Sequence, residues 1–143
     1  MKLFLIIIFS ALAMYCQEDI HRWKPLVINE KEKIWFDQSM LDSTRSNKID
    51  MWILQMHRPP LTFEGIDGEI YRSKTLYTID LKTVKYGIRD VVYYDVTNKE
   101  IQKFHYDIDK YPDNYKYTYP IMENSFLFKL IKEIFGKTGE NSN

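Results

Sequence analysis

Histidine and aspartate are the clearest candidates for chemistry in this sequence. The histidines are His21, His57 and His105, and Asp107 follows His105 by two residues. Because alternate residues of a β-strand share a face, His105 and Asp107 would project together, while His57 lies on a different predicted strand. Two imidazoles and a carboxylate suit a metal ion such as zinc. The alternative is that these histidines are scattered surface residues of a polar-faced sheet.

Other sequence features of enzymes do not appear. A hydrolytic site needs a nucleophile, a base and a group that stabilises an oxyanion. Gly65 and Gly68 flank a turn and do not precede a helix, so they do not form a phosphate-binding loop. A strand–turn–helix nucleophile motif is not visible either. We therefore predict a protein with no catalytic residues, no metal site and no cofactor.

A tyrosine-rich segment, DKYPDNYKYTYP at residues 109–120, is the first candidate for a binding surface. Tyrosine is favoured in interfaces because it brings contact area and a hydroxyl with few torsions to restrict. In an extended run, Tyr115, Tyr117 and Tyr119 would project from one side. The alternatives are tyrosines packed on the rim of the sheet, and an edge strand that pairs with a second copy in a homodimer. The predicted partner-contact residues are Lys110, Tyr111, Tyr115, Lys116, Tyr117 and Tyr119.

A second candidate surface is the stretch RPPLTFEGIDGEIYRS, residues 58–73. Leu61, Phe63 and Ile66 are apolar residues in a loop-like segment, and loops tend to carry recognition. The alternative, which we favour, is a long hairpin connection that folds back onto the core.

The charge balance limits the classes of partner. The chain has 143 residues, with 20 basic and 20 acidic side chains. A nucleic-acid-binding domain normally carries a basic excess, so we predict a protein partner and no nucleic acid. Aromatic residues make up 15% of the chain, and there are only 5 glycines and 5 prolines, which indicates a packed domain rather than a linker.

The N-terminus has the pattern of a secretory signal. Lys2 precedes an apolar run, Leu3–Phe9, which is followed by small residues and is too short to span a bilayer as a helix. Cleavage after Ala13 and cleavage after Cys16 both stay open. We take residues 1–16 as the signal peptide. The predicted location is the periplasm, the outer cell surface or the extracellular space.

The remaining chain divides into one domain, residues 17–136, and a polar tail, residues 137–143. Bacterial lipid attachment needs a small residue before the cysteine, and Tyr15 precedes Cys16, so we predict no lipid anchor. Cys16 is the only cysteine, so no intramolecular disulfide can form. The domain must therefore be held together by packing.

Short β-rich runs separated by polar turns fill most of the domain. Their frequency, with no long helix between them, predicts an α+β fold: an antiparallel meander of about five to six strands with a C-terminal helix packed on it. The stretch IDMWILQMH, residues 49–57, is apolar on both faces, which indicates a central strand covered on each side. The predicted strands are Trp23–Ile28, Ile34–Asp37, Ile49–Arg58, Thr75–Lys82, Tyr86–Val96 and Ile101–Ile108.

The last two strands are predicted to form a hairpin around Asn98 and Lys99. A two-residue turn there would pair Tyr93 with Phe104. Lysine tolerates a positive φ poorly, so a longer loop with a shifted register stays open.

The C-terminal helix is indicated by its caps and its apolar stripe. Asn124 or Ser125 is a suitable N-cap, and Gly136 follows the last apolar residue. The stripe that would pack against the sheet consists of Leu127, Leu130, Ile131 and Ile134.

In their order and spacing, RWKPL, IWFDQSML, MWILQMH, KTLYTIDLKTVKYGI, VVYYDVTNKEI and YPIMENS, followed by a helix, resemble the surface-adhesin protein E-like domain of bacteria. The resemblance covers about residues 23–135. It implies an exported domain with an antiparallel sheet and a packed C-terminal helix. The best-known member of that family is a dimeric adhesin of the outer membrane that binds host extracellular-matrix proteins, and the resemblance implies a similar role. Members commonly carry a cysteine pair, whose places are taken here by Leu81 and by Ile134 or Phe135, and apolar packing is expected to replace the disulfide.

Three functions follow as expectations. The first is a bacterial surface or periplasmic binding module of adhesin type that acts by protein–protein contact without catalysis. The second is an envelope accessory or inhibitory protein that binds one bacterial partner. The third is a small-ligand carrier or enzyme, which would require His57, His105 and Asp107 to meet in one pocket.

Overall fold

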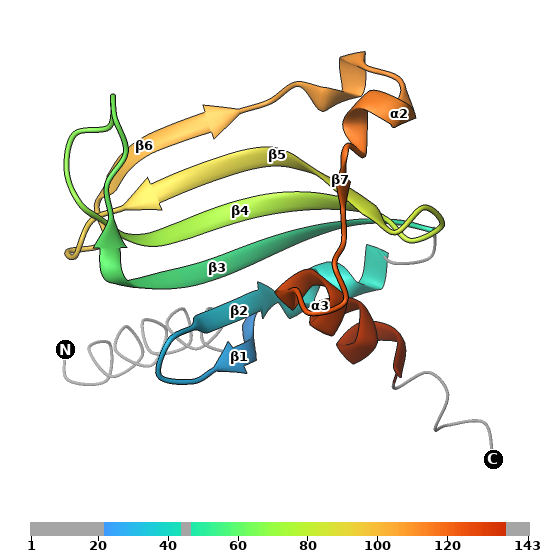
Figure 1. Ribbon diagram of the computed structural model, residues 1–143, viewed down its shortest axis with the longest axis horizontal. Coiled ribbons are helices and arrows are strands. Elements are labelled where there is room, and N and C mark those ends of the chain that lie inside the picture. Colours follow the sequence, from blue (N-terminus) through green and yellow to red (C-terminus); the bar gives the residue numbers. More distant parts are fainter. Residues whose placement is uncertain (1–21, 44–46, 137–143) are drawn as a thin grey trace, which may run out of the picture.

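The computed structural model describes residues 22–43 and 47–136, which form one antiparallel sheet and a C-terminal helix (Figure 1). The first six strands lie in chain order across the sheet, and a short seventh strand pairs with β5. The predicted signal peptide, Cys16, His21 and the polar tail lie outside the described residues. The elements are β1 (Trp23–Ile28), β2 (Lys33–Asp37), η1 (Gln38–Ser43), β3 (Lys48–Leu61), β4 (Ile70–Asp80), β5 (Lys85–Tyr94), β6 (Glu100–His105), η2 (Ile108–Lys110), α2 (Asp113–Lys116), β7 (Tyr119–Pro120) and α3 (Phe126–Phe135).

The predicted meander with its C-terminal helix is confirmed, and most strand bounds agree within a few residues. The main difference is at β3 and β4, which are longer than predicted. Leu61 pairs with Ile70, and Ile70 is fully buried, so half of the second candidate surface is strand and its loop is only residues 62–69. The polar residues at the start of β4 hid this extension from a pattern based on alternating apolar residues.

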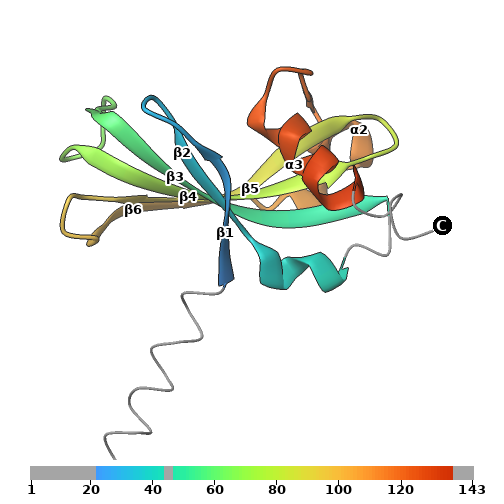
Figure 2. The same ribbon diagram turned by 90° about the horizontal axis from the view of Figure 1, so that it is seen from below.

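Helix α3 covers one face of the sheet (Figure 2). Ile49, Met51 and Ile53 of the central strand β3 are buried on this face, in the same cluster as Leu127 and Leu130 of the helix. Leu130 has 0% exposure. The predicted stripe is confirmed, since Ile131 and Ile134 also pack against the cluster. Because burying one such aliphatic side chain contributes roughly 1.5–3 kcal/mol, the helix is a main source of stability.

The caps of α3 agree with the sequence only in part. Ser125 is the N-cap: its hydroxyl oxygen accepts a hydrogen bond from the Phe128 amide at 3.3 Å. Gly136 is the C-cap, but it has a right-handed φ of −63° rather than the left-handed conformation for which glycine is usually chosen. An ion pair of 2.8 Å between Lys24 and Glu133 joins the helix to β1.

The opposite face of β3 carries Trp52, Leu54 and Met56, which are only partly buried. The prediction that β3 is central in the sheet is confirmed, since it pairs with β2 and β4. This face lacks the burial that the sequence predicted on both sides of β3; one cation packs on it, since the Lys74 ammonium lies 4.5 Å from the centroid of the Trp52 ring. Face α, the face under α3, and face β, the opposite face, are therefore chemically different.

The β5–β6 hairpin has the longer loop that the sequence left open, so the pairing of Tyr93 with Phe104 is wrong. Val91 lies opposite Phe104, and Tyr93 lies opposite Gln102. The Asp95 carboxylate explains the change, because it accepts hydrogen bonds from the Thr97 and Lys99 amides and closes a loop of residues 95–99. The register moves by two residues, so Tyr93 and Phe104 still share a face of the sheet although they are not paired.

A row of aromatic side chains in contact with one another crosses face α and ends at β7. Phe126 of α3 contacts Tyr77, Tyr77 contacts Tyr86, and Tyr86 contacts Tyr119, with ring centroids 5.7, 5.5 and 5.4 Å apart. Such contacts stabilise beyond the area that they bury. The chain of rings therefore joins the helix, the centre of the sheet and the last strand into one packed unit.

Tyr77 should make the fold sensitive to alkaline pH. Burial is the main cause that raises its pKa from 10.0 to about 12. Because the folded state holds this proton more tightly, the stabilisation is fully present below pH 10 and is lost as the pH rises toward 12. A shift of this size corresponds to about 2–3 kcal/mol. We expect the free energy of unfolding, measured by urea denaturation, to fall more steeply over this range in the wild type than in Tyr77→Phe.

The matched control is Tyr111→Phe, since Tyr111 is exposed. It should follow the wild type. Equal slopes for the wild type and Tyr77→Phe would show that Tyr77 is not enclosed as described.

Candidate functional site

The candidate site is built by the chain between β6 and β7, residues 106–118, which we call the excursion. Strand β6 pairs with Asp90–Tyr94 of β5, and β7 pairs with Lys85 and Tyr86 on the same edge of that strand. The excursion leaves the sheet between these two pairings, forms η2 and α2, and returns (Figure 1). It is fixed at its start by a hydrogen bond of 2.8 Å from the Tyr106 amide to the Arg89 carbonyl.

A close backbone approach holds the far end of the excursion. The Lys116 carbonyl lies against Gly87 of β5, so that a Cβ added to Gly87 would be 2.1 Å from the Lys116 oxygen. Only glycine permits this approach. Just beyond, the Ile121 amide donates to the Val84 carbonyl at 2.9 Å.

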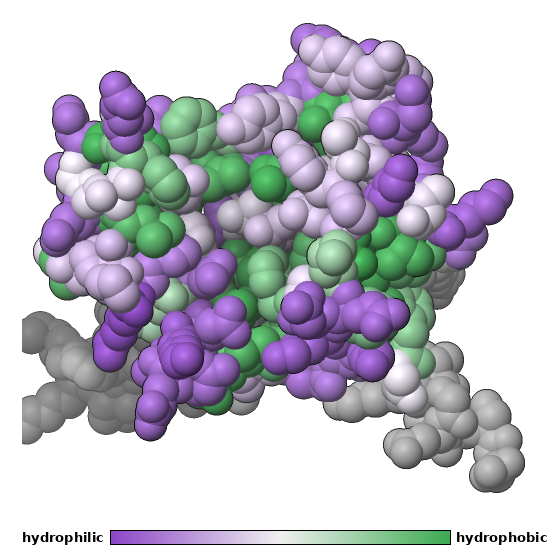
Figure 3. All heavy atoms as spheres, viewed as in Figure 1, coloured by the Kyte–Doolittle hydropathy of each residue, from purple (hydrophilic) through white to green (hydrophobic). Residues whose placement is uncertain are grey.

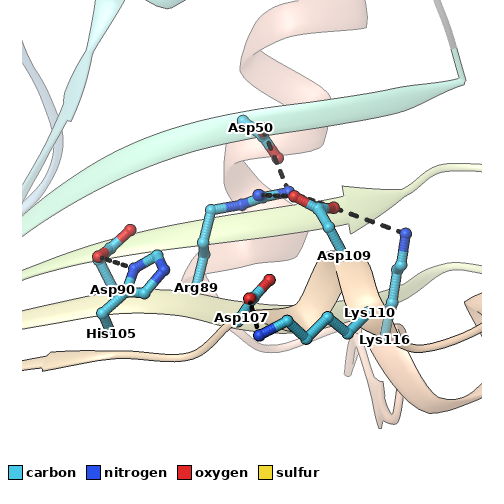
Figure 4. Close-up of polar contacts among 8 residues, drawn as sticks. All are labelled: Asp50, Arg89, Asp90, His105, Asp107, Asp109, Lys110 and Lys116. Carbon is cyan, nitrogen blue, oxygen red and sulfur yellow. Dashed lines mark hydrogen bonds and ion pairs between the residues drawn. The ribbon is translucent and has the colours of Figure 1, made fainter.

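Charged side chains join the excursion to the sheet from the side of face β (Figure 4). Arg89 donates two hydrogen bonds to the Asp109 carboxylate, of 2.5 and 3.2 Å, and also lies 3.9 Å from Asp50 of β3. Lys116 lies 3.6 Å from Asp109. The hydrogen bond from Arg89 is the largest cause that holds the pKa of Asp109 below its ordinary value. Exposed pairs stabilise little singly, but the fork of Arg89 fixes the orientation of η2.

These contacts create an open groove of about 700 Å³ between the excursion and β5. Four tyrosines along it are roughly half exposed or more: Tyr106 at 48%, Tyr111 at 59%, Tyr115 at 68% and Tyr119 at 53%. The volume lies within the range of small-molecule sites, but exposed rings around an open hollow are typical of a contact surface. The groove is also lined by Gly87, Ile88, Val91, Tyr93, His105, Asp107, Ile108, Lys110, Lys116 and Thr118.

Five of the six predicted contact residues line this groove: Lys110, Tyr111, Tyr115, Lys116 and Tyr119. Tyr117 does not. It is only 7% exposed, and the Lys48 ammonium lies 5.4 Å from the centroid of its ring. The expected extended run is interrupted by α2, so Tyr117 turns into the packing that supports the groove.

The sequence did not predict the groove-lining residues that β5 and the start of the excursion contribute. Tyr93 and Tyr106 line the groove together with Ile88 and Val91. The signal that could have found them is the alternation of Val91 and Tyr93 on one face of β5. The pairing of β7 with β5 brings the excursion against the face of β5 that carries Val91 and Tyr93. No sequence pattern predicts this pairing.

The residues 62–69 loop folds onto the sheet as expected. The Phe63 ring lies 5.9 Å from that of Tyr93, which lies 6.1 Å from that of Phe104. Figure 3 shows apolar side chains gathered over the ends of β5 and β6 that lie next to this loop. Phe63 remains 46% exposed, so this loop covers its part of face α incompletely.

The candidate catalytic or metal residues do not meet. His57 Nε2 lies 2.9 Å from Ser73 Oγ, and burial lowers the pKa of His57. His105 Nδ1 lies 2.7 Å from Asp90 on face β, while Asp107 pairs with Lys110. Within residues 22–43 and 47–136 no group of three or more histidine, cysteine, aspartate or glutamate side chains could hold a metal ion.

Comparison of the chain with protein-family models, with curated proteins and with solved structures found no match. The resemblance to the surface-adhesin protein E-like domain therefore stays a prediction from the sequence. In the described part of the chain, no helix has the length and apolar character needed to cross a membrane.

Replacing Gly87 should displace the excursion. In Gly87→Ala the new methyl group would overlap the backbone oxygen of Lys116, which cannot move without moving α2. We expect a loss of about 1–3 kcal/mol in the free energy of unfolding, measured by urea denaturation. Gly136→Ala is the control, because its added Cβ meets nothing within 4 Å and its φ suits any residue. Equal stability of Gly87→Ala and the wild type would contradict the close approach.

Proposed function

We propose that this chain is an exported binding module that acts by contact with a protein partner, and that the tyrosine groove is its contact surface. The observation that carries the proposal is the placement of four exposed tyrosines around one groove. Tyrosine supplies a large amphipathic area at low cost in side-chain entropy. We assign no reaction to the domain, because the two described histidines, His57 and His105, are engaged separately with Ser73 and Asp90.

The groove suits binding because its rim is already held in place. Arg89 holds η2 through Asp109, and Lys48 holds α2 through an ion pair of 2.5 Å with Asp113. A surface that does not need to be ordered on binding loses less entropy when a partner arrives. The rim also combines rings with the Lys110 and Lys116 cations, a mixture that interfaces favour.

The partner class follows from the resemblance stated above, which favours host extracellular-matrix proteins. A bacterial envelope protein is the second candidate. Different experiments distinguish these two partner classes. Binding to purified matrix proteins supports the first, and a stoichiometric complex recovered from the native envelope supports the second. A homodimer formed through an edge strand of the tyrosine-rich segment, residues 109–120, stays a prediction.

Binding should depend on the groove tyrosines. We expect the variant Tyr111→Ala/Tyr115→Ala to bind its partner at least about tenfold more weakly than the wild type, since exposed aromatic anchors typically contribute 1–2 kcal/mol or more each. The measurement is biolayer interferometry of the mature chain against a panel of purified extracellular-matrix proteins. Because both side chains are largely exposed, the fold should be unaffected.

Val96→Ser is the matched control. Val96 is 68% exposed in the β5–β6 loop and does not line the groove. Its affinity should equal that of the wild type. Equal affinities for the double variant and the control would remove the groove from the proposal, and no binding to any matrix protein would remove the host-adhesion form of it.

A further inference from the structure

The surface that the tyrosine groove offers to a partner consists mainly of flat rings that carry hydroxyl groups. The exposed rings belong to Tyr106, Tyr111, Tyr115 and Tyr119, whereas the aliphatic side chain of Val91 on the same wall is only 9% exposed. Such a surface restricts the conformation and the charge of the segment that can bind to it.

The edge of β5 that borders the groove is not open to an added strand. The Arg89 carbonyl already accepts a hydrogen bond from the Tyr106 amide at 2.8 Å, and the Lys116 carbonyl lies against Gly87. Strand addition depends on unpaired main-chain groups along such an edge. A segment bound in the groove is therefore held by side chains and not by a β-ladder.

The cations of the groove are paired with carboxylates (Figure 4). The Lys110 ammonium lies 2.6 Å from the Asp107 carboxylate, and the Lys116 ammonium lies 3.6 Å from Asp109, which Arg89 also binds. Recognition of an acidic or phosphorylated segment uses a cluster of arginines whose donors face the ligand. The charges of the groove therefore complement an uncharged segment.

The exposed tyrosines select among uncharged segments. An amphipathic helix needs a continuous apolar groove, and phenol hydroxyls interrupt the apolar surface here. A polyproline II segment has no internal hydrogen bonds, so its carbonyl groups can accept hydrogen bonds while its proline rings pack on aromatic faces. Tyrosine supplies both the ring face and a hydroxyl donor.

We infer, on the basis of the function proposed above, that the tyrosine groove binds an uncharged, proline-rich segment of the partner in the polyproline II conformation. Such a segment is extended before it binds, and the rim of the groove is held by the contacts of Arg89 with Asp109. Both sides of the interface therefore lose little conformational entropy on binding.

Two blocked peptides of ten prolines, one of L-proline and one of D-proline, are the probes. They have the same composition and the opposite helical hand. Each is titrated into the isotope-labelled mature chain while the backbone amides of Tyr111 and Tyr115 are followed by NMR. We expect saturable shifts from the L-proline peptide with a Kd of about 1 mM or below, and at least about tenfold weaker binding of the D-proline peptide.

Three results would overturn the inference: equal binding of the two peptides, no saturable shift from the L-proline peptide, or tighter binding of a neutral oligosaccharide such as maltoheptaose. Equal binding would show contact with apolar rings of either hand. Tighter binding of the oligosaccharide would show a site for sugar rings.

Variants place the peptide in the groove. Tyr111→Leu/Tyr115→Leu keeps apolar side chains at both positions but removes the rings and hydroxyls, so it should bind the L-proline peptide at least about tenfold more weakly. Val96→Ser is the control, since Val96 is exposed and does not line the groove, and it should bind as the wild type does. Unchanged binding in the double variant would overturn the inference. The comparison of the two peptides on the wild type decides the matter if the double variant does not fold.

The partner and the peptide test different claims. A protein that binds the wild type but not Tyr111→Ala/Tyr115→Ala, together with no saturable shift from the L-proline peptide, would leave the proposed function standing and overturn the polyproline II segment. Saturable binding of the L-proline peptide that is lost in the leucine variant would support the segment even if no matrix protein binds.

Discussion

Two strands, β6 and β7, pair with different parts of the same edge of β5. The position of the excursion and of the tyrosine groove depends on this arrangement. Residues 90–94 of that edge pair with β6, and Lys85 and Tyr86 pair with β7. The chain between these partners cannot pair with β5 in a regular ladder, so it must leave the sheet and return. The tyrosine groove is the space that this detour encloses. Gly87 lies between the two pairings, where the returning chain approaches β5 closely.

The same constraint connects the groove to the core. Strand β7 leads directly into the segment before α3, and Ile121 of that segment is buried in the core cluster. The rings of Tyr119, Tyr86, Tyr77 and Phe126 continue the connection from the groove to the helix. The domain has no disulfide to provide such a link, since the chain's only cysteine is Cys16. Leu81 and Ile134 pack against the apolar cluster instead.

The sequence predicted the parts of the fold that depend on periodicity. Alternating residues indicated the meander, and the spacing of Leu127, Leu130, Ile131 and Ile134 indicated the packed helix, because burial of one face imposes these patterns. Of the six residues that the sequence predicted for partner contact, five line one groove. It could not predict β7, which is two residues long, or the burial of Tyr117, because α2 changes the direction of a run that was treated as extended. The hairpin register depended on hydrogen bonds of the Asp95 side chain, which periodicity does not report.

The central claim is that the excursion is fixed on the sheet before any partner binds. Native-state hydrogen exchange tests it most directly at the amides of Tyr106, Tyr117 and Ile121, which donate to the carbonyls of Arg89, Asp113 and Val84. We expect these amides in the isolated mature chain to exchange at least about 100-fold more slowly than in an unstructured peptide. Exchange at the peptide rate, with the amides of β3 and β4 still protected, would contradict it.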